Sequence, residues 1–256
     1  MILSRQARQK SQSGIYHVIL RGINKQVIFE EEEDRQKFLE CLGHYKFGCQ
    51  YQIYGYCLMD NHVHLLIKEG EQDIGSIMKR IGVGYVSWYN RKYNRCGHLF
   101  QDRFKSEVVE TDEYVLSVLR YIHQNALKAG LVNKVEDFSG SSYDEYIGSY
   151  KIIDGDFILG IFSEKKETAV KGFKKFMAEK TDEVDCLEAH EKIMLSDEDV
   201  KRIIQESANV KTPAALQAMK KEERDAYLRE IKLVKGVSTR QIARLTGISQ
   251  SVISRA

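Results

Sequence analysis

Two histidines stand one residue apart in an otherwise apolar stretch, YCLMDNHVHLLI, which covers residues 56–67. Because successive side chains of a strand point to opposite faces, His62 and His64 would share one face while Val63 takes the other. A pair of charged imidazoles is costly to bury, so such histidines are usually neutral and hydrogen-bonded, or they bind a metal ion. The pair alone fits two core histidines and a zinc site equally well.

The segment DEYVLSVLRYIHQNALKAG, residues 112–130, adds a tyrosine and an amide to this pair. At about 100° per residue, Tyr121 and Asn125 lie on one face of a helix, whereas His123 points away from both. Gln124 is the second choice for the amide. A carboxamide oxygen is a hard donor that could join two imidazoles around Mg²⁺ or Mn²⁺ and leave positions open for a phosphate. Without the histidine pair, Tyr121 would be an ordinary half-buried helix tyrosine.

The elements that must position these side chains follow from hydrophobic period and capping residues. Strands are predicted at residues 15–20, 51–58, 62–68 and 106–110. Helices are predicted after the acidic residues 30–34, at 73–93, and from the N-cap Thr111 to about residue 130. The order β-α-β-β-α-β, followed by another helix, is the ferredoxin-like pattern. The sequence thus predicts an α+β fold in residues 1–135, with one antiparallel sheet and helices on one side.

Residues 136–195 are predicted to form an accessory, mainly helical segment. It contains the turn-rich stretch DFSGSSYDEYIGSY, the short apolar run FILGIF and a charged helix at residues 165–180. From residue 196 to residue 256 the hydrophobic period is helical throughout. An all-α region is therefore expected to follow the first domain.

The sequence STRQIARLTGISQSVISRA, residues 238–256, is typical of a helix-turn-helix. Ser238 is placed as N-cap, the small Ala243 permits close helix approach, and Gly247 makes the turn. The second helix would then present three residues to the major groove of duplex DNA: Gln250, Ser251 and Arg255. The alternative is an ordinary helical hairpin in a small bundle.

The composition, 43% apolar and 30% charged, fits a soluble globular protein. No apolar run approaches the roughly 20 residues of a membrane helix, so a membrane partner is not expected. The basic N-terminus has no apolar signal core, and the expected location is cytoplasmic. Five cysteines lie far apart and are predicted to be reduced, mostly buried thiols: Cys41, Cys49, Cys57, Cys96 and Cys186.

The net charge of +2 conceals two basic stretches. Residues 1–29 contain no acid, and residues 79–105 contain Asp102 as their one acid. Such stretches suit a polyanion, and the interleaved aromatics of the second could stack on exposed bases. The cations expected to contact DNA are Arg21, Lys79, Arg80, Arg91, Lys92, Arg103 and Lys105. For residues 79–105 taken alone, a solvated helix whose aromatics point into the core is the preferred interpretation.

Four motifs together resemble those of the single-tyrosine HUH transposases, an IS200-like family, most closely the REP-associated tyrosine transposase group. They are YHVILRGIN at residues 16–24, MDNHVHLLI at 59–67, GHLFQDRFKS at 97–106 and RYIHQNALKAGLV at 120–132. Their order and spacing are similar to those of the family, and they cover about the first half of the chain. An isolated His-x-His is common, but four motifs in register are much more specific.

The resemblance implies the HUH endonuclease fold, with Tyr121 as nucleophile and His62, His64 and Asn125 as ligands of Mg²⁺ or Mn²⁺. It implies a DNA transposase that cleaves and rejoins single-stranded or hairpin DNA. Tyrosine attack would leave a 5′-phosphotyrosine link and a free 3′-hydroxyl, which can reverse the step on another end.

Two positions depart from the family pattern. Asp60 stands where proline often precedes the Asn-His pair, and Ala126 stands where proline often follows the helical asparagine. Asp60 could orient one of the histidines, but a turn residue that caps its own backbone is the preferred interpretation. Without proline at position 126, the helix can continue toward Gly130.

Two other functions fit parts of the sequence. One is a non-catalytic DNA-binding regulator derived from a transposase, in which Tyr121 is unused. The other is a zinc hydrolase built around the two histidines, although no HExxH motif or nearby third ligand completes such a site. The assembly is expected to be a monomer or a homodimer.

Overall fold

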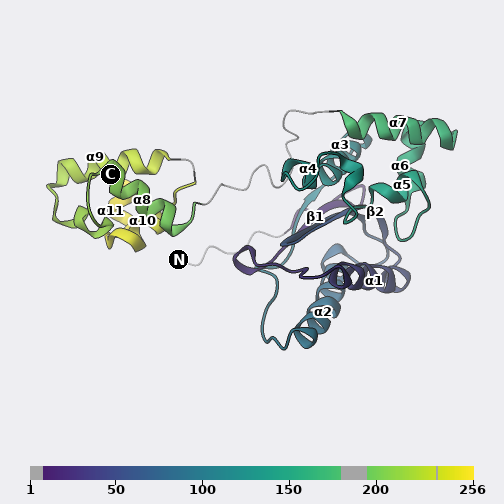
Figure 1. Ribbon diagram of the computed structural model, residues 1–256, viewed down its shortest axis with the longest axis horizontal. Coiled ribbons are helices and arrows are strands. Elements are labelled where there is room, and N and C mark those ends of the chain that lie inside the picture. The colour runs from purple at the N-terminus through teal and green to yellow at the C-terminus, as the bar shows by residue number, and fades with distance from the viewer. Residues whose placement is uncertain (1–7, 180–194, 235) are drawn as a thin grey trace. The chain divides into compact units, whose positions relative to one another are not determined.

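Four antiparallel strands form one sheet in the computed structural model, which describes residues 8–179, 195–234 and 236–256 (Figure 1). The strands lie in the order β2-β3-β1-β4, and each neighbouring pair is antiparallel. Their bounds are β1 Ile15–Arg21, β2 Gln52–Met59, β3 His62–Lys68 and β4 Lys105–Val108. The predicted order of strands and helices and the antiparallel ferredoxin-like sheet are confirmed.

Helices α1 (Glu32–Cys49) and α2 (Ile74–Lys92) cover one side of this sheet (Figure 1). Acidic residues begin α1, where the helix dipole favours negative charge, and Glu31 and Asp34 form a reciprocal capping box. Asp73 caps α2 through its carboxylate. A short 3₁₀ helix, η1 (Ile23–Lys25), follows β1.

The aromatic residues of α2 and the loop after it belong to the core. Tyr85 and Tyr89 are 0% and 1% exposed, and the Tyr85 hydroxyl donates to the backbone carbonyl of Ile28. The others pack against the same core in partly buried positions: Trp88, Tyr93 and Phe100. The interpretation of these aromatics as core residues is therefore confirmed.

The opposite side of the sheet is covered by α3 (Asp112–His123) and α4 (Asn125–Lys128) (Figure 1). Thr111 caps α3 as predicted. The helix predicted to run to about residue 130 is interrupted at Gln124, which separates the two helices. Helices thus lie on both sides of the sheet. The predicted placement on one side is correct for α1 and α2 but not for α3 and α4.

The described part of the predicted accessory segment continues the core of the sheet. It contains η2 (Val135–Asp137), α5 (Tyr143–Ile147), α6 (Gly155–Phe162), formed by the run FILGIF, and α7 (Lys166–Ala178). Tyr146, Ile158 and Phe173 are buried in the same cluster as the strands. These elements therefore complete the first compact unit of the chain, which spans Met1–Ala189.

The second compact unit, His190–Ala256, has a small core of its own. Its described residues form helices and no strand: α8 (Asp197–Ser207), η3 (Pro213–Ala218), α9 (Lys221–Leu233), α10 (Thr239–Thr246) and α11 (Gln250–Arg255). Ser238 caps α10 in a capping box with Gln241. Gly247 has a φ of 72°, a backbone conformation that favours glycine, and it ends α10.

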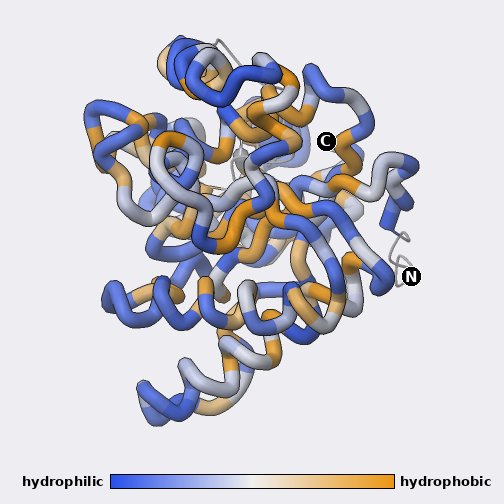
Figure 2. Tube along the Cα trace, turned by 90° about the vertical axis from the view of Figure 1, so that its right-hand side faces the viewer, coloured by the Kyte–Doolittle hydropathy of each residue, from blue (hydrophilic) through white to orange (hydrophobic). Residues whose placement is uncertain are grey.

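Figure 2 shows that hydrophobic and hydrophilic residues alternate along the helices and strands. Among the cysteines, Cys41, Cys49 and Cys57 are buried, and Cys96 is exposed. Cys186 lies outside the described residues. None of the helices in the described parts of the chain is both long enough and apolar enough to cross a membrane.

Candidate active site

The two histidines of β3 lie on one face of the sheet, as the strand period predicts. His64 stands opposite Ile19 of β1, and His62 stands opposite Arg21. Val63, on the other face, is fully buried. The rings of His62 and His64 are 5.0 Å apart between centroids and nearly perpendicular, at 81°. The sheet therefore presents two imidazoles side by side toward the helices that cover this face.

Tyr121 and Asn125 reach the same point from those helices. The ring of Tyr121 lies edge-on to His64, with centroids 5.6 Å apart. The side-chain nitrogen of Asn125 is 3.1 Å from Nε2 of His64. Tyr121 and Asn125 are 9% and 8% exposed, so α3 and α4 pack directly against the histidines. The structure thus brings together the tyrosine, the amide and the histidine pair.

The neighbouring polar residues of α3 point elsewhere. His123 is fully buried with its Nε2 2.8 Å from the Ser142 hydroxyl, and burial lowers its pKa to about 3. Gln124 donates to the backbone carbonyls of Met177 and Glu179, at 2.8 and 3.0 Å. Gln124 is therefore occupied by α7, which leaves Asn125 as the amide of the site.

Three further residues belong to this cluster and were not found from the sequence. His17 of β1 is fully buried, and its Nε2 is 3.0 Å from Nδ1 of His64. Glu107 of β4 lies with Oε1 3.3 Å from Nδ1 of His17, and the same oxygen accepts from the Tyr114 hydroxyl at 2.7 Å. The available signal was the alternation in IYHVIL, which predicts that the His17 side chain shares a face with Ile15 and Ile19.

Two imidazoles and one amide are available as ligands for a divalent cation. Nδ1 of His62 lies 2.6 Å from Oδ1 of Asn61; an amide oxygen only accepts, so Nδ1 donates and Nε2 keeps its lone pair for a ligand. Two imidazoles and a carboxamide then leave coordination positions for phosphate or water oxygens, as Mg²⁺ prefers. No group of three or more His, Cys, Asp or Glu in the described residues is placed to hold a metal ion.

Asp60 does not orient either histidine. Its carboxylate pairs with Arg35, and its backbone carbonyl accepts from the N–H groups of Ile28 and Phe29. Asp60 thus lies in the turn between β2 and β3, as preferred from the sequence, but its carboxylate pairs with Arg35 and does not cap its own backbone. The residue that contacts His62 is Asn61 instead.

Six of the seven cations predicted to contact DNA fall into two groups, and Lys92 is separate from both. Arg21 and Lys105 share the sheet face of the histidines, because they stand opposite His62 and Ile19 in the strand register. Lys128 of α4 adds a third charge on that side, with its ammonium 5.0 Å from the centre of the Tyr121 ring. Others are exposed on α2 or in the loop before β4: Lys79, Arg80, Arg91 and Arg103.

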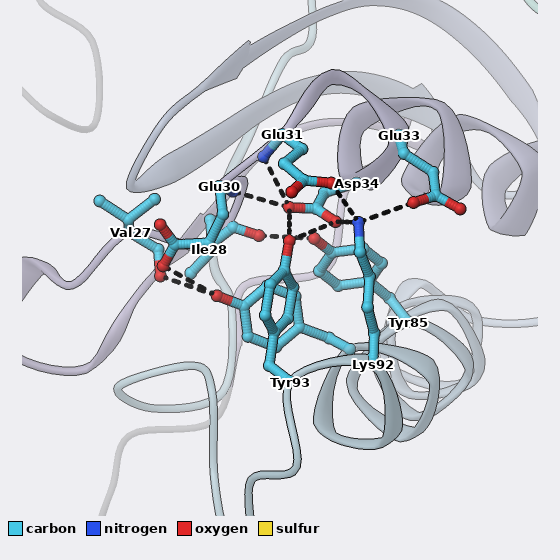
Figure 3. A network of polar contacts seen from close by, with 10 residues as sticks. Val27, Ile28, Glu30, Glu31, Glu33, Asp34, Tyr85, Lys92 and Tyr93 are labelled. Carbon is cyan, nitrogen blue, oxygen red and sulfur yellow. Dashed lines mark hydrogen bonds and ion pairs between the residues drawn. The ribbon is translucent and has the colours of Figure 1, made fainter.

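Lys92 has a different role from the predicted one (Figure 3). Its ammonium lies 2.8 Å from Asp34, 3.0 Å from Glu31 and 2.8 Å from Glu33, at the start of α1. Burial alone would raise the pKa of Asp34, yet hydrogen bonds from Lys92, Tyr93 and backbone N–H groups lower that pKa below its usual 3.8. Lys92 therefore joins α2 to α1, and its charge is already matched.

The three residues predicted to read duplex DNA lie on α11. All three are exposed: Gln250, Ser251 and Arg255. The Gln250 amide donates to the Thr239 hydroxyl at 3.1 Å, and the Arg255 Nε donates to the Ser251 carbonyl at 3.1 Å. Ile242, Ile248 and Ile253 are buried in the core of this unit. Binding of duplex DNA by this helix pair stays a prediction.

Part of this chain is similar to known transposases. Residues 10–125 match the family model described as transposase IS200 like. A REP-associated tyrosine transposase of Haemophilus influenzae is 23% identical over 158 residues, which cover 55% of this chain and 86% of that protein. A solved REP-associated tyrosine transposase bound to a REP hairpin is 19% identical, with a TM-score of 0.49, and the match covers 59% of this chain and 90% of that one. Residues 10–125 therefore carry the similarity to the IS200-like transposases.

Proposed function

We propose that this protein cleaves and rejoins single-stranded DNA, with Tyr121 as nucleophile and a divalent metal ion held by His62, His64 and Asn125. One observation carries the proposal. Tyr121 and Asn125 come from the helices on one side of the site, and both lie against His64, which comes from the sheet. The similarity of residues 10–125 to the IS200-like transposases supports DNA as the substrate class.

The chemistry begins with a phenol that is a weak nucleophile near neutral pH, because a free tyrosine has a pKa near 10. The Tyr121 oxygen would form a bond to phosphorus while the bond from phosphorus to the 3′-oxygen breaks. The phenolic proton leaves Tyr121, and the departing 3′-oxygen ends as a hydroxyl. A bound Mg²⁺ or Mn²⁺ would supply charge stabilisation at the phosphodiester oxygens.

The chain's own residues hold the reacting groups. His64 is fixed on two sides, by His17 and by Asn125, so its ring cannot turn without breaking a hydrogen bond. The link from Tyr121 to the 5′-phosphate keeps the energy of the broken bond, so a 3′-hydroxyl can reverse the step without ATP. Arg21, Lys105 and Lys128 place positive charge where a DNA backbone would approach this face.

We assign duplex DNA binding to the second unit, through Gln250, Ser251 and Arg255 of α11. The capped helix α10, the glycine turn and the short α11 form the hairpin that such a motif requires. The two units would then have separate tasks, one recognising duplex DNA and the other cutting a single strand.

Incubation of the full chain with a labelled single-stranded hairpin oligonucleotide tests the proposal. We expect a covalent protein–DNA adduct that requires Mg²⁺ or Mn²⁺ and is absent in Tyr121→Phe. Tyr45→Phe, on α1 across the sheet, is the matched control and should keep the adduct. Metal-independent binding without any adduct would indicate the DNA-binding regulator instead. An adduct that survives in Tyr121→Phe would refute the assignment of the nucleophile.

A further inference from the structure

A buried line of hydrogen bonds runs across three strands behind the histidine pair. It joins Asn125 to His64, His64 to His17 and His17 to Glu107, at 3.1, 3.0 and 3.3 Å. His17 and His64 are both fully buried, and the side chain of Glu107 is 18% exposed. This line is built by the strand register, because Glu107 of β4 stands opposite His17 of β1.

The carboxylate at one end sets the direction of every bond in the line. An ionised carboxylate can only accept, so Nδ1 of His17 must donate to Glu107. In a neutral imidazole the other nitrogen then carries no hydrogen, so Nε2 of His17 must accept. Its partner, Nδ1 of His64, is therefore the donor. His64 is left with its Nε2 lone pair directed toward Asn125.

The amide at the other end demands the same direction. The Asn125 side-chain nitrogen is a donor only, and it faces Nε2 of His64. That nitrogen must accept, which again places the hydrogen of His64 on Nδ1. The carboxylate therefore sets one tautomer for each buried histidine, and the orientation of the Asn125 amide agrees with it.

We propose that Glu107 and His17 are positioning residues that hold His64 in the Nδ1–H tautomer and so reserve its Nε2 for the metal ion. The proposal deepens the proposed function and rests on its metal site. Tyr114, which donates to Glu107 from the first turn of α3, also ties this line to the helix that carries Tyr121. A partner of this kind fixes both the tautomer and the ring orientation of a metal-binding histidine.

Buried imidazoles need hydrogen-bond partners in any case, so the positioning role must be distinguished from a purely structural one. Glu107→Gln separates the two roles because it keeps the shape of the side chain. An amide can either accept from His17 or donate to it, and a donating amide reverses the whole line. A reversed line removes the Nδ1–H form of His64 in either case. If the line is purely structural, Mn²⁺ affinity is unchanged by the reversal; if it positions His64, Mn²⁺ affinity falls because Nε2 then carries a hydrogen.

The test combines two measurements on the full chain. Nitrogen-15 NMR of histidine-labelled protein without added metal reads the tautomers, and calorimetric titration with Mn²⁺ reads the affinity. We expect Nδ1–H forms of His17 and His64 in the wild type. In Glu107→Gln we expect mixed forms of His64 and roughly 10–100-fold weaker Mn²⁺ binding. Glu110→Gln is the matched control, since Glu110 accepts from the backbone N–H groups of Gln12 and Ser13 and should change neither measurement.

Each other result overturns the proposal. If His64 of the wild type is in the Nε2–H form, the proposal is refuted without any variant. Glu107→Gln that keeps a pure Nδ1–H form, with or without weaker binding, removes the positioning role and leaves the proposed function standing. A wild type that binds no Mn²⁺ while showing the Nδ1–H form overturns the metal site itself, and the positioning role with it.

Discussion

Gly55 of β2 controls how closely α3, the helix that carries Tyr121, approaches the sheet. A Cβ at this position would lie 2.3 Å from Cδ1 of Leu119, a fully buried residue of α3. Carbon atoms pack at about 3.5–4.0 Å, so Gly55→Ala must displace Leu119 by more than ~1 Å. Leu119 precedes Tyr121 by two residues on the same helix. We therefore expect the substitution to perturb both the core and the position of Tyr121, the proposed nucleophile.

Overpacking of this size should lower the free energy of unfolding by about 1–3 kcal/mol. A displacement of ~1 Å at the reacting group can cost roughly 100-fold in rate, so adduct formation should fall more steeply than stability does. Urea unfolding followed by tryptophan fluorescence measures the first part. The chain has a single tryptophan, Trp88, which packs against the core of the first unit and so reports on that unit alone.

Two further variants show whether the effect comes from this contact. Gly82→Ala, on α2, meets no heavy atom within 4 Å and should be neutral or stabilise by up to about 1 kcal/mol. Leu119→Ala alone should cost about 2–5 kcal/mol, but less in the Gly55→Ala background, where it removes the clash. A Gly55→Ala protein with the wild-type urea midpoint and cleavage rate would show that α3 is not held at this distance by Gly55.

Three other predictions concern separate parts of the chain. Gln124→Ala should lower the free energy of unfolding in urea by about 1–3 kcal/mol, because two carbonyls at the end of α7 lose their donor, and it should leave Mn²⁺ affinity unchanged. Asn125→Ala should weaken Mn²⁺ binding. The reverse pattern would exchange the roles of the two residues. The pKa of Asp34 is lower in the folded protein than its unfolded value near 3.8, so the ionised carboxylate stabilises the fold above that pH. This stability is lost as the pH falls through the lower folded pKa. Lys92→Met should raise the Asp34 pKa, so unfolding followed by circular dichroism should begin at a higher pH; an unchanged acid transition would contradict this. Arg255→Ala should weaken binding to duplex DNA and reduce the slope of log binding constant against log salt concentration by about one. An unaltered slope would exclude a phosphate contact by Arg255.

Local periodicity was sufficient to predict the fold and the central part of the site. The two-residue period of a strand placed His62 and His64 on one face, and the four-residue spacing of a helix placed Tyr121 with Asn125. Both inferences needed only neighbouring residues, and the structure brings the four side chains together. Capping chemistry likewise predicted the starts of α3 at Thr111 and of α10 at Ser238.

Features that depend on strand register or on distant partners could not be predicted in the same way. His17 and Glu107 are 90 residues apart and meet because β1 and β4 pair in one register, which no local pattern specifies. Lys92 belongs to a basic stretch of the sequence, yet its position against the acids of α1 depends on how two helices pack. Similarly, the interruption at Gln124 accompanies hydrogen bonds to a helix that begins more than 40 residues later.

The accessory helices are part of the site because they fix the rotation of α3 about its own axis. Arg120 and Gln124 each precede a site residue, and both are anchored to the end of α7. The Arg120 guanidinium lies 4.0 Å from the centre of the Phe176 ring, and Gln124 donates to two backbone carbonyls. One residue of helix rotation is about 100°, so these anchors on one face determine that Tyr121 and Asn125 face the sheet. The site therefore requires contacts on both sides of α3, from the histidines of β3 and from α7.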